Sequence, residues 1–181
     1  MPSTSAGKRA PATKTRSAKA RSAATGRDAI ALLKADHREV EAMFAQFEKA
    51  SGEARKGELA DRICLALKVH TQIEEEIFYP AAREALKAKD EDMMDEAIVE
   101  HAAAKDLVAE IEEMEPGQEL FDAKVKVLSE QIEHHVGEEE KEIFPTLQKT
   151  DMDMDALGAR MAARKAELTR SLARSNGRAV H

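Results

Sequence analysis

The stretch KVHTQIEEEIFYP, residues 68–80, decides the fold expected of this chain. Its His70 is followed four residues later by Glu74, and a short apolar and aromatic run then ends at Pro80. Residues four apart on a helix lie on one face, about one turn apart. The stretch therefore predicts a helix that directs an imidazole and a carboxylate toward the same point.

A second stretch, EHHVGEEEKEIFP at residues 133–145, repeats this pattern. When the two stretches are aligned on their final prolines, His135 takes the place of His70, and Glu139 follows it by the same four residues. Two such pairs facing each other would form a metal site with mixed nitrogen and oxygen ligands. The rest of the chain can be interpreted as the scaffold that brings the pairs together.

The composition favours an all-helical protein. Of the 181 residues, 43% are hydrophobic, 35% charged and only 3% aromatic, and no alternating run of β-branched and aromatic residues indicates a strand. No stretch approaches the roughly 20 apolar residues of a membrane span, and the N-terminus lacks the apolar middle of a signal peptide. The single cysteine, Cys64, cannot form an internal disulfide. We therefore expect a cytoplasmic protein that does not contact a membrane, and we expect Cys64 to be buried.

Residues 1–27 form a basic segment that we expect to be disordered. They contain Lys and Arg but no Asp or Glu, and no Ile, Leu, Val or Phe that could form a core. Such an arm could contact nucleic acid, or it could act as a solubilising leader. The second interpretation is preferred because the segment has no aromatic residue to stack on bases.

Apolar residues recur three and four positions apart over four long segments, which predicts four helices. The expected helices cover about 28–50 and 58–87, a segment from near Asp90 to the Pro116-Gly117 turn, and one carrying Phe121 to Ile143; Gly52 and Gly57 flank a loop between the first two. Short connections imply antiparallel neighbours, so we predict an up-down-up-down four-helix bundle over residues 28–148. Residues 149–181 add a C-terminal amphipathic helix and tail. Pro80 should kink or end the second helix.

Each of the four helices has a histidine where its apolar stripe should continue. These residues are His37, His70, His101 and His135. A single histidine on an apolar face is usually a hydrogen-bonded core residue, but one on each of four stripes indicates a shared site. Histidines placed at random would also occur on the abundant polar faces.

Two carboxylates, Glu74 and Glu139, lie one turn after a stripe histidine. Burying an isolated carboxylate is costly unless it is paired or bound to a metal. The alternative is that both belong to the exposed acidic runs around them. Imidazole and carboxylate without thiolate suit iron, manganese or zinc. Six ligands exceed the four of tetrahedral zinc and suit two octahedral ions bridged by carboxylates.

The pattern resembles the hemerythrin-like, or HHE cation-binding, family. The resemblance covers roughly residues 28–148 and is carried by ADH at 35–37, VHTQIEEEIFYP at 69–80, EH at 100–101 and HHVGEEEKEIFP at 134–145. It implies a four-helix bundle that holds two oxo- or hydroxo-bridged iron ions. It further implies a protein that binds dioxygen, senses oxygen, redox state or iron, or handles nitric oxide or peroxide.

The resemblance also implies roles for single residues. His37, His70, His101 and His135 match nitrogen ligands, and Glu74 and Glu139 match bridging carboxylates. In the last helix, His134 with Glu138 or Glu140 is an alternative register. His135 is preferred because it continues the stripe and matches His70 in its distance to proline.

The chain departs from the oxygen carriers of the family at one point. Those proteins have two histidines one turn apart on the third helix, whereas Ala97 and Lys105 lie one turn either side of His101. Water or Glu41 could complete the coordination instead. Tyr79 lies off the stripe, so we expect it to be peripheral to the site.

Three functions follow as hypotheses. The first is a monomeric di-iron protein that binds dioxygen, another small ligand such as nitric oxide or peroxide, or iron, in sensing, buffering or storage. The second is a di-iron enzyme with peroxidase-like, catalase-like or NO-reducing activity, favoured by the missing fifth histidine. The third is a metal-free bundle whose arm at residues 1–27 binds nucleic acid.

Overall fold

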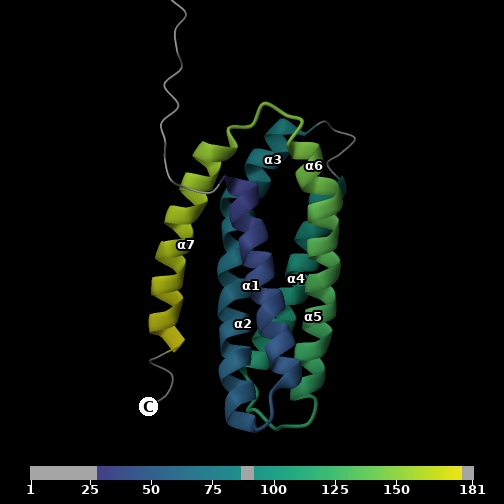
Figure 1. The fold of residues 1–181 in the computed structure, drawn as a ribbon, viewed down its shortest axis with the longest axis vertical. Coiled ribbons are helices and arrows are strands. Elements are labelled where there is room, and N and C mark those ends of the chain that lie inside the picture. The colour runs from purple at the N-terminus through teal and green to yellow at the C-terminus, as the bar shows by residue number, and fades with distance from the viewer. Residues whose placement is uncertain (1–27, 87–91, 177–181) are drawn as a thin grey trace, which may run out of the picture.

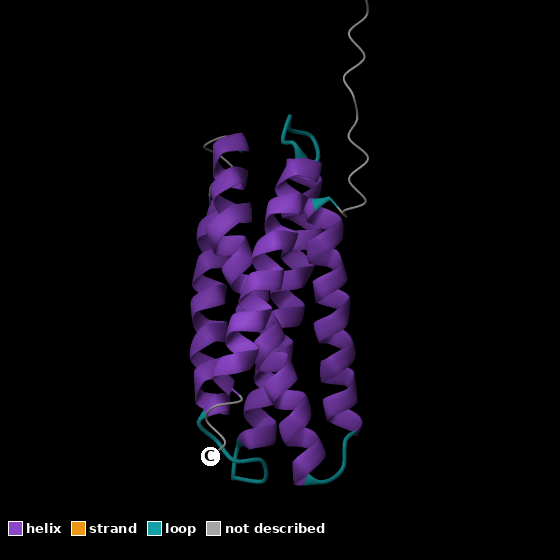
Figure 2. Ribbon diagram, turned by 90° about the vertical axis from the view of Figure 1, so that its left-hand side faces the viewer, coloured by secondary structure: helices purple, strands orange, loops and turns teal. Residues whose placement is uncertain are grey.

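A computed structural model describes residues 28–86 and 92–176, and the regular structure in those ranges is helical throughout (Figure 1, Figure 2). The elements are α1 (Ala29–Lys49), α2 (Glu53–Ile73), the π-helical turn η1 (Glu74–Phe78), α3 (Tyr79–Ala85), α4 (Asp92–Glu112), α5 (Phe121–Glu138), the π-helical turn η3 (Glu139–Ile143), α6 (Phe144–Leu147) and α7 (Met154–Asn176). The turns η1 and η3 join their flanking helices without a break. The expected disordered arm and the expected helix start at Asp90 lie outside the described residues.

Four long helical rods form the predicted bundle: α1, α2 with η1 and α3, α4, and α5 with η3 and α6. Contacts join α1 to α2, α2 to α4, α4 to α5 and α5 to α1, so rods that follow one another in the chain are also neighbours around the bundle. Figure 1 shows the α1–α2 and α4–α5 connections at the same end of the molecule. This arrangement confirms the up-down-up-down fold class.

Helix α7 lies outside the bundle against α1 and α2 (Figure 1). Its Leu157, Met161 and Leu168 are buried and join the core formed by the bundle helices. The predicted extra amphipathic helix is therefore confirmed. None of the helices in the described ranges has the length and low charge needed to cross a bilayer.

The core consists of two apolar clusters with a polar layer between them. Along α1, Leu33 belongs to one cluster and Val40 to the other, and His37 lies between them in sequence. The same holds on α4, where His101 lies between Ala97 and Ala104. The histidine positions therefore mark one level of the bundle.

Helix α2 begins earlier than predicted. Gly52 precedes it with a φ of 88°, and Gly57 lies inside the helix. A Cβ atom at Gly57 would lie 2.7 Å from Cγ of Pro116 in the α4–α5 connection. The expected loop at Gly57 was wrong because this glycine permits close packing of the connection instead of breaking the helix.

The chain also remains helical through Pro80 and Pro145. Proline lacks an N–H and clashes with the preceding turn of a regular helix. The π-helical segments accommodate each proline because one turn of the helix is wider there. In η1 the N–H of Tyr79 donates to the carbonyl of Glu74, five residues back. The N–H of Phe144 likewise donates to the carbonyl of Glu139.

Candidate metal centre

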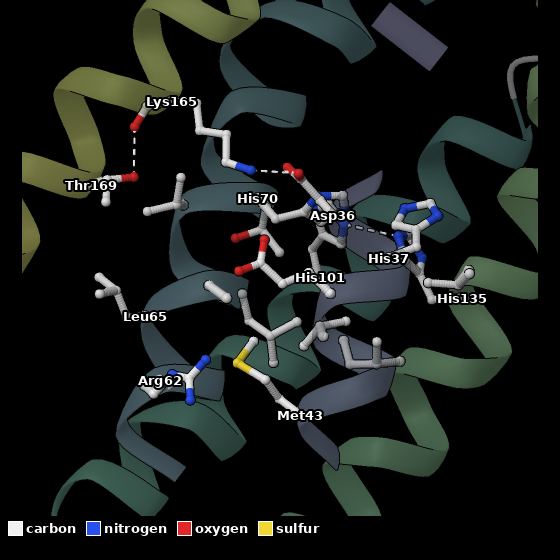
Figure 3. Close-up of a pocket in the computed structure, with 18 residues that line it drawn as sticks. Asp36, His37, Met43, Arg62, Leu65, His70, His101, His135, Lys165 and Thr169 are labelled. Carbon is white, nitrogen blue, oxygen red and sulfur yellow. Dashed lines mark hydrogen bonds and ion pairs between the residues drawn. The ribbon is translucent and has the colours of Figure 1, made fainter. Parts of the chain in front are cut away.

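The four stripe histidines come together at the middle of the bundle. His37 on α1, His70 on α2, His101 on α4 and His135 on α5 are all buried, and Figure 3 shows them around one pocket. Glu74 and Glu139, the first residues of the two π-helical turns, have no exposed surface. The structure therefore places all six predicted site residues at one level of the core. His134, the alternative to His135, is 64% exposed.

Each buried carboxylate lies between imidazoles from two helices. Oε2 of Glu74 is 3.1 Å from Nε2 of His70 and 3.4 Å from Nε2 of His101. On the other side, Oε2 of Glu139 is 3.2 Å from Nε2 of His37 and 3.8 Å from Nε2 of His135. All four Nε2 atoms thus face inward.

These atoms form two overlapping groups with metal-ligand spacing. His37, His70, Glu74 and Glu139 offer atoms that all lie within 4.8 Å of one another, and so do Glu74, His101 and His135. Glu74 belongs to both groups. The two groups could each hold a cation and would then share one carboxylate, with four residues in the first group and three in the second.

Several buried polar atoms of the site lack a hydrogen-bond partner, which supports the binding of cations there. Nε2 of His37, both ring nitrogens of His70, both carboxylate oxygens of Glu74 and Oε2 of Glu139 are buried without a hydrogen-bond partner. A buried polar atom without a partner costs roughly 1–3 kcal/mol. A cation at each position would satisfy the inward-facing atoms of this set, whereas Nδ1 of His70 faces Asp36. Imidazole and carboxylate ligands suit iron, manganese or zinc.

Burial and neighbouring charges set the protonation of the centre. Burial, together with the neighbouring Glu139, raises the pKa of Glu74 well above its usual range. Burial alone would raise the pKa of Glu139 too, but the His37 contact and nearby histidines hold it at about 2. Burial lowers the pKa of His70 to about 4. For His37, burial is outweighed by Glu139, and the pKa rises to about 9. Cation binding must therefore displace protons from this site.

The second ring nitrogen of each histidine faces a carboxylate from the neighbouring rod. The Nδ1 distances are 3.7 Å from His70 to Asp36, 3.1 Å from His101 to Glu75, 2.8 Å from His135 to Glu100 and 3.1 Å from His37 to Glu140. Such partners fix the orientation of a metal-binding imidazole. The carboxylates form a closed ring around the bundle. A carboxylate on α1 faces the histidine of α2, and one on η1 faces the histidine of α4. A carboxylate on α4 faces the histidine of α5, and one on η3 faces the histidine of α1.

Sequence reasoning missed this ring, although a signal was present. Each outer carboxylate is the chain neighbour of an inner residue, as in Asp36-His37, Glu74-Glu75, Glu100-His101 and Glu139-Glu140. Consecutive residues on a helix point about 100° apart because there are 3.6 residues per turn. A residue beside an inward-facing one therefore reaches the adjacent rod.

Tyr79 is part of the centre, so the expectation that it is peripheral was wrong. Its ring is buried, and its O–H donates to Oε1 of Glu139 at 3.1 Å and lies 3.3 Å from Nε2 of His101. The π-helical turn before it adds a residue to one turn, which moves Tyr79 onto the inner face. Glu41, the carboxylate considered for completing the coordination, is exposed on α1 and belongs to neither group.

A cavity of about 220 Å³ connects the centre with helix α7 (Figure 3). Its walls include apolar side chains from three rods: Met43, Leu65, Leu67, Val69, Ile132 and Val136. Arg62, Lys165 and Thr169 also line it. The cavity has room for a small ligand beside the histidines in mainly apolar surroundings.

Comparison with known proteins decides the family. The sequence profile of the hemerythrin HHE cation-binding domain matches residues 28–147. The chain belongs to the hemerythrin HHE family. The HHE match covers the bundle up to α6 and excludes α7.

Two relatives of this HHE protein are informative. A crystal structure of a hemerythrin HHE cation-binding domain-containing protein from Mycobacterium kansasii superposes with a TM-score of 0.68 at 22% identity, covering 80% of this chain and 89% of that one. This likeness supports the fold. A DNA nickase from Nostoc sp. (strain PCC 7120) is 25% identical over 116 residues, which are 64% of this chain and 32% of the nickase. The chain thus spans about a third of the length of that relative.

Proposed function

We propose that this HHE protein holds two bridged iron ions and binds dioxygen, a related small ligand such as nitric oxide or peroxide, or iron, in sensing, buffering or storage. The observation that carries the proposal is the pair of overlapping ligand groups joined by Glu74. His37, His70 and Glu139 would hold one ion with Glu74, and His101 and His135 would hold the other. When bound, the iron pair supplies reversible redox chemistry and open positions for a small ligand.

The surrounding residues support binding of a small, weakly polar ligand. The cavity ends at the histidines, and the apolar side chains in its wall suit such a ligand. Lys165, which lines the cavity from α7, is already paired, because it donates to Oδ1 of Asp36 at 2.5 Å. Tyr79 already donates to Oε1 of Glu139 and so restrains a carboxylate of the first ligand group. The match to part of a DNA nickase does not change the proposal, since it covers about a third of that protein.

The spectrum of the iron-loaded protein tests the proposal. The full chain is loaded with ferrous iron without air, and dioxygen or nitric oxide is then admitted. A binding protein should show a stable change in visible absorption that reverses when the gas is removed. No spectral change with either gas, in protein shown to contain iron, would contradict small-ligand binding.

A second candidate function is a di-iron enzyme of the peroxidase, catalase or NO-reducing kind. It is favoured by the second position, which has only His101, His135 and the shared Glu74, with the hydroxyl of Tyr79 beside it. A position with few protein ligands leaves room for substrate, and the phenol provides a proton there. Peroxide turnover above that of free iron, lost in His70→Ala and reduced in Tyr79→Phe with iron retained, would favour the enzyme.

A further inference from the structure

Three of the four outer carboxylates are held by a basic side chain. Asp36 pairs with Lys165 at 2.5 Å, Glu75 with Lys105 at 2.6 Å, and Glu140 with Lys34 at 3.5 Å and Arg38 at 3.2 Å. At His70, His101 and His37 the histidine is therefore followed by a carboxylate and then by a basic side chain on the outside of the bundle. Glu100 is the fourth carboxylate, and within the described residues no Lys or Arg pairs with it.

In place of a basic side chain, Glu100 faces a histidine and a second carboxylate. Its Oε2 is 2.8 Å from Nδ1 of the buried His135, and its Oε1 is 3.4 Å from Nε2 of His134. Oε1 of Glu138 lies 3.2 Å from the same Nε2 atom. Ligand atoms of Glu100, His134 and Glu138 all lie within 4.8 Å of one another.

The local structure explains how these groups meet. His134 and Glu138 are four residues apart on α5, so they share a face, and Glu100 reaches them from the adjacent α4. Around His134 the surface is acidic: the hollow beside it is lined by Glu130, Glu133, Glu138 and Glu142, with Lys141 as its basic member. This surface attracts cations.

We propose that Glu100, His134 and Glu138 form a surface site for a divalent cation such as Zn²⁺ or Fe²⁺, distinct from the buried centre. One imidazole and two carboxylates without a thiolate suit these ions, and the exposure of His134 leaves the remaining coordination to water. An ion there supplies the outer positive charge that lysine or arginine supplies at the other three carboxylates. It also holds Glu100 against His135, one of the proposed buried ligands.

Zn²⁺ titration of the iron-loaded full chain, followed by calorimetry, tests the site. The wild-type protein should bind one Zn²⁺ without releasing iron, and His134→Ala and Glu138→Gln should each weaken this binding at least about tenfold. Glu133→Gln is the matched control, because Glu133 lines the same hollow but is not part of the group. It should bind Zn²⁺ like the wild type. Equal affinity in His134→Ala and wild type, or no Zn²⁺ binding by the wild type, would overturn the proposal.

The same titration in the Glu74→Gln variant separates the test of the surface site from the test of the buried centre. In Glu74→Gln the two buried groups lose the carboxylate that they share, whereas the surface residues are unchanged. Adding His134→Ala to Glu74→Gln should still remove a Zn²⁺ site, whether or not the buried centre takes up iron. If the double variant binds as much Zn²⁺ as Glu74→Gln alone, the surface site is rejected. The proposed function is tested separately, by the iron content of the loaded protein.

Discussion

Glu74 is the residue on which both proposed ion positions depend. It has no exposed surface, both its oxygens lack a hydrogen-bond partner, and it belongs to both ligand groups. The sequence analysis selected it from an acidic run of three, Glu74–Glu76, by its spacing from His70. Its neighbours in the run have other roles: Glu75 contacts His101, and Glu76 pairs with Arg164.

Replacing Glu74 by Gln should reduce the iron content of the loaded protein to one ion per chain or fewer. The amide keeps the shape of the side chain but provides one weak acceptor in place of two charged oxygens. Metal analysis together with the helical circular dichroism signal checks this. Glu142→Gln, an exposed change in the second acidic run, should keep the wild-type iron content. Two irons per chain in Glu74→Gln would show that the shared carboxylate is not needed.

Cys64 illustrates a buried group away from the centre. Burial, with the nearby Glu112 and Asp61, raises the pKa of its thiol to about 12 from a usual value near 9. A thiol whose pKa is raised by folding stays neutral in the folded protein, so its contribution to stability is lost only as the pH rises above about 9. The thiol should therefore react very slowly with a thiol-specific reagent at pH 8, and fully after unfolding in denaturant. Rapid reaction of the folded protein at pH 8 would contradict its burial.

At the scale of single elements, the π-helical turns decide which side chains reach the centre. Each begins at an inner glutamate and is followed by a proline at the second residue of the next helix. The repeated Pro80 and Pro145 were visible in the sequence, but the wider turn was not, because a proline in a helix can produce a kink, a helix end or a π-bulge. For that reason the inward position of Tyr79 was missed.

Gly57 in α2 and Gly137 in α5 are predicted to respond in opposite ways to alanine. Alanine is favoured over glycine inside a helix by about 1 kcal/mol. At Gly57 the added methyl would lie 2.7 Å from the ring of Pro116, whereas at Gly137 the nearest atom is Lys141 Nζ at 3.4 Å. Overpacking costs about 1–3 kcal/mol. Gly57→Ala should therefore lower the free energy of unfolding and Gly137→Ala should raise or preserve it, as measured in urea.

Helix α7 is expected to affect the centre although it lies outside the HHE match. Its Lys165 pairs with Asp36, which faces Nδ1 of His70. Lys165→Ala leaves Asp36 without its lysine partner and His70 less firmly oriented. Iron affinity should therefore fall about 10–100-fold, which is the usual effect of losing a residue that orients a metal ligand. Competition with a chelator measures this. Arg170→Ala is the control, since the Arg170 side chain bonds to the Ala166 carbonyl on α7 itself. Equal iron affinity in the two variants would contradict the coupling.

At the scale of the whole molecule, the centre divides the core into two apolar clusters. The bundle and its helix order were predictable because the three-four spacing of apolar residues sets the helices and their inner faces. The inward positions of His37, His70, His101 and His135 followed from the same spacing. The outer ring of carboxylates was not predictable in this way, because it depends on which rods are neighbours and how they are rotated. The place of Gly57 inside α2 likewise depends on a contact with Pro116 that spacing along the chain does not reveal.

In the part of the chain that the structure describes, four histidines and two glutamates are buried at one level, with four outer carboxylates around them, in a chain with a net charge of −7. Buried carboxylates and unpaired imidazole nitrogens between two apolar clusters are costly unless cations satisfy them. The central claim is that the six residues bind two ions and share one carboxylate between them.

The most direct test is the iron content of the full chain, loaded with ferrous iron without air and freed of unbound metal. Two irons per chain are predicted for the wild type. His70→Ala and His101→Ala, which each remove one ligand from a different group, should each hold no more than one. A wild-type protein that retains no iron, or that binds the same amount as both histidine variants, would contradict the account.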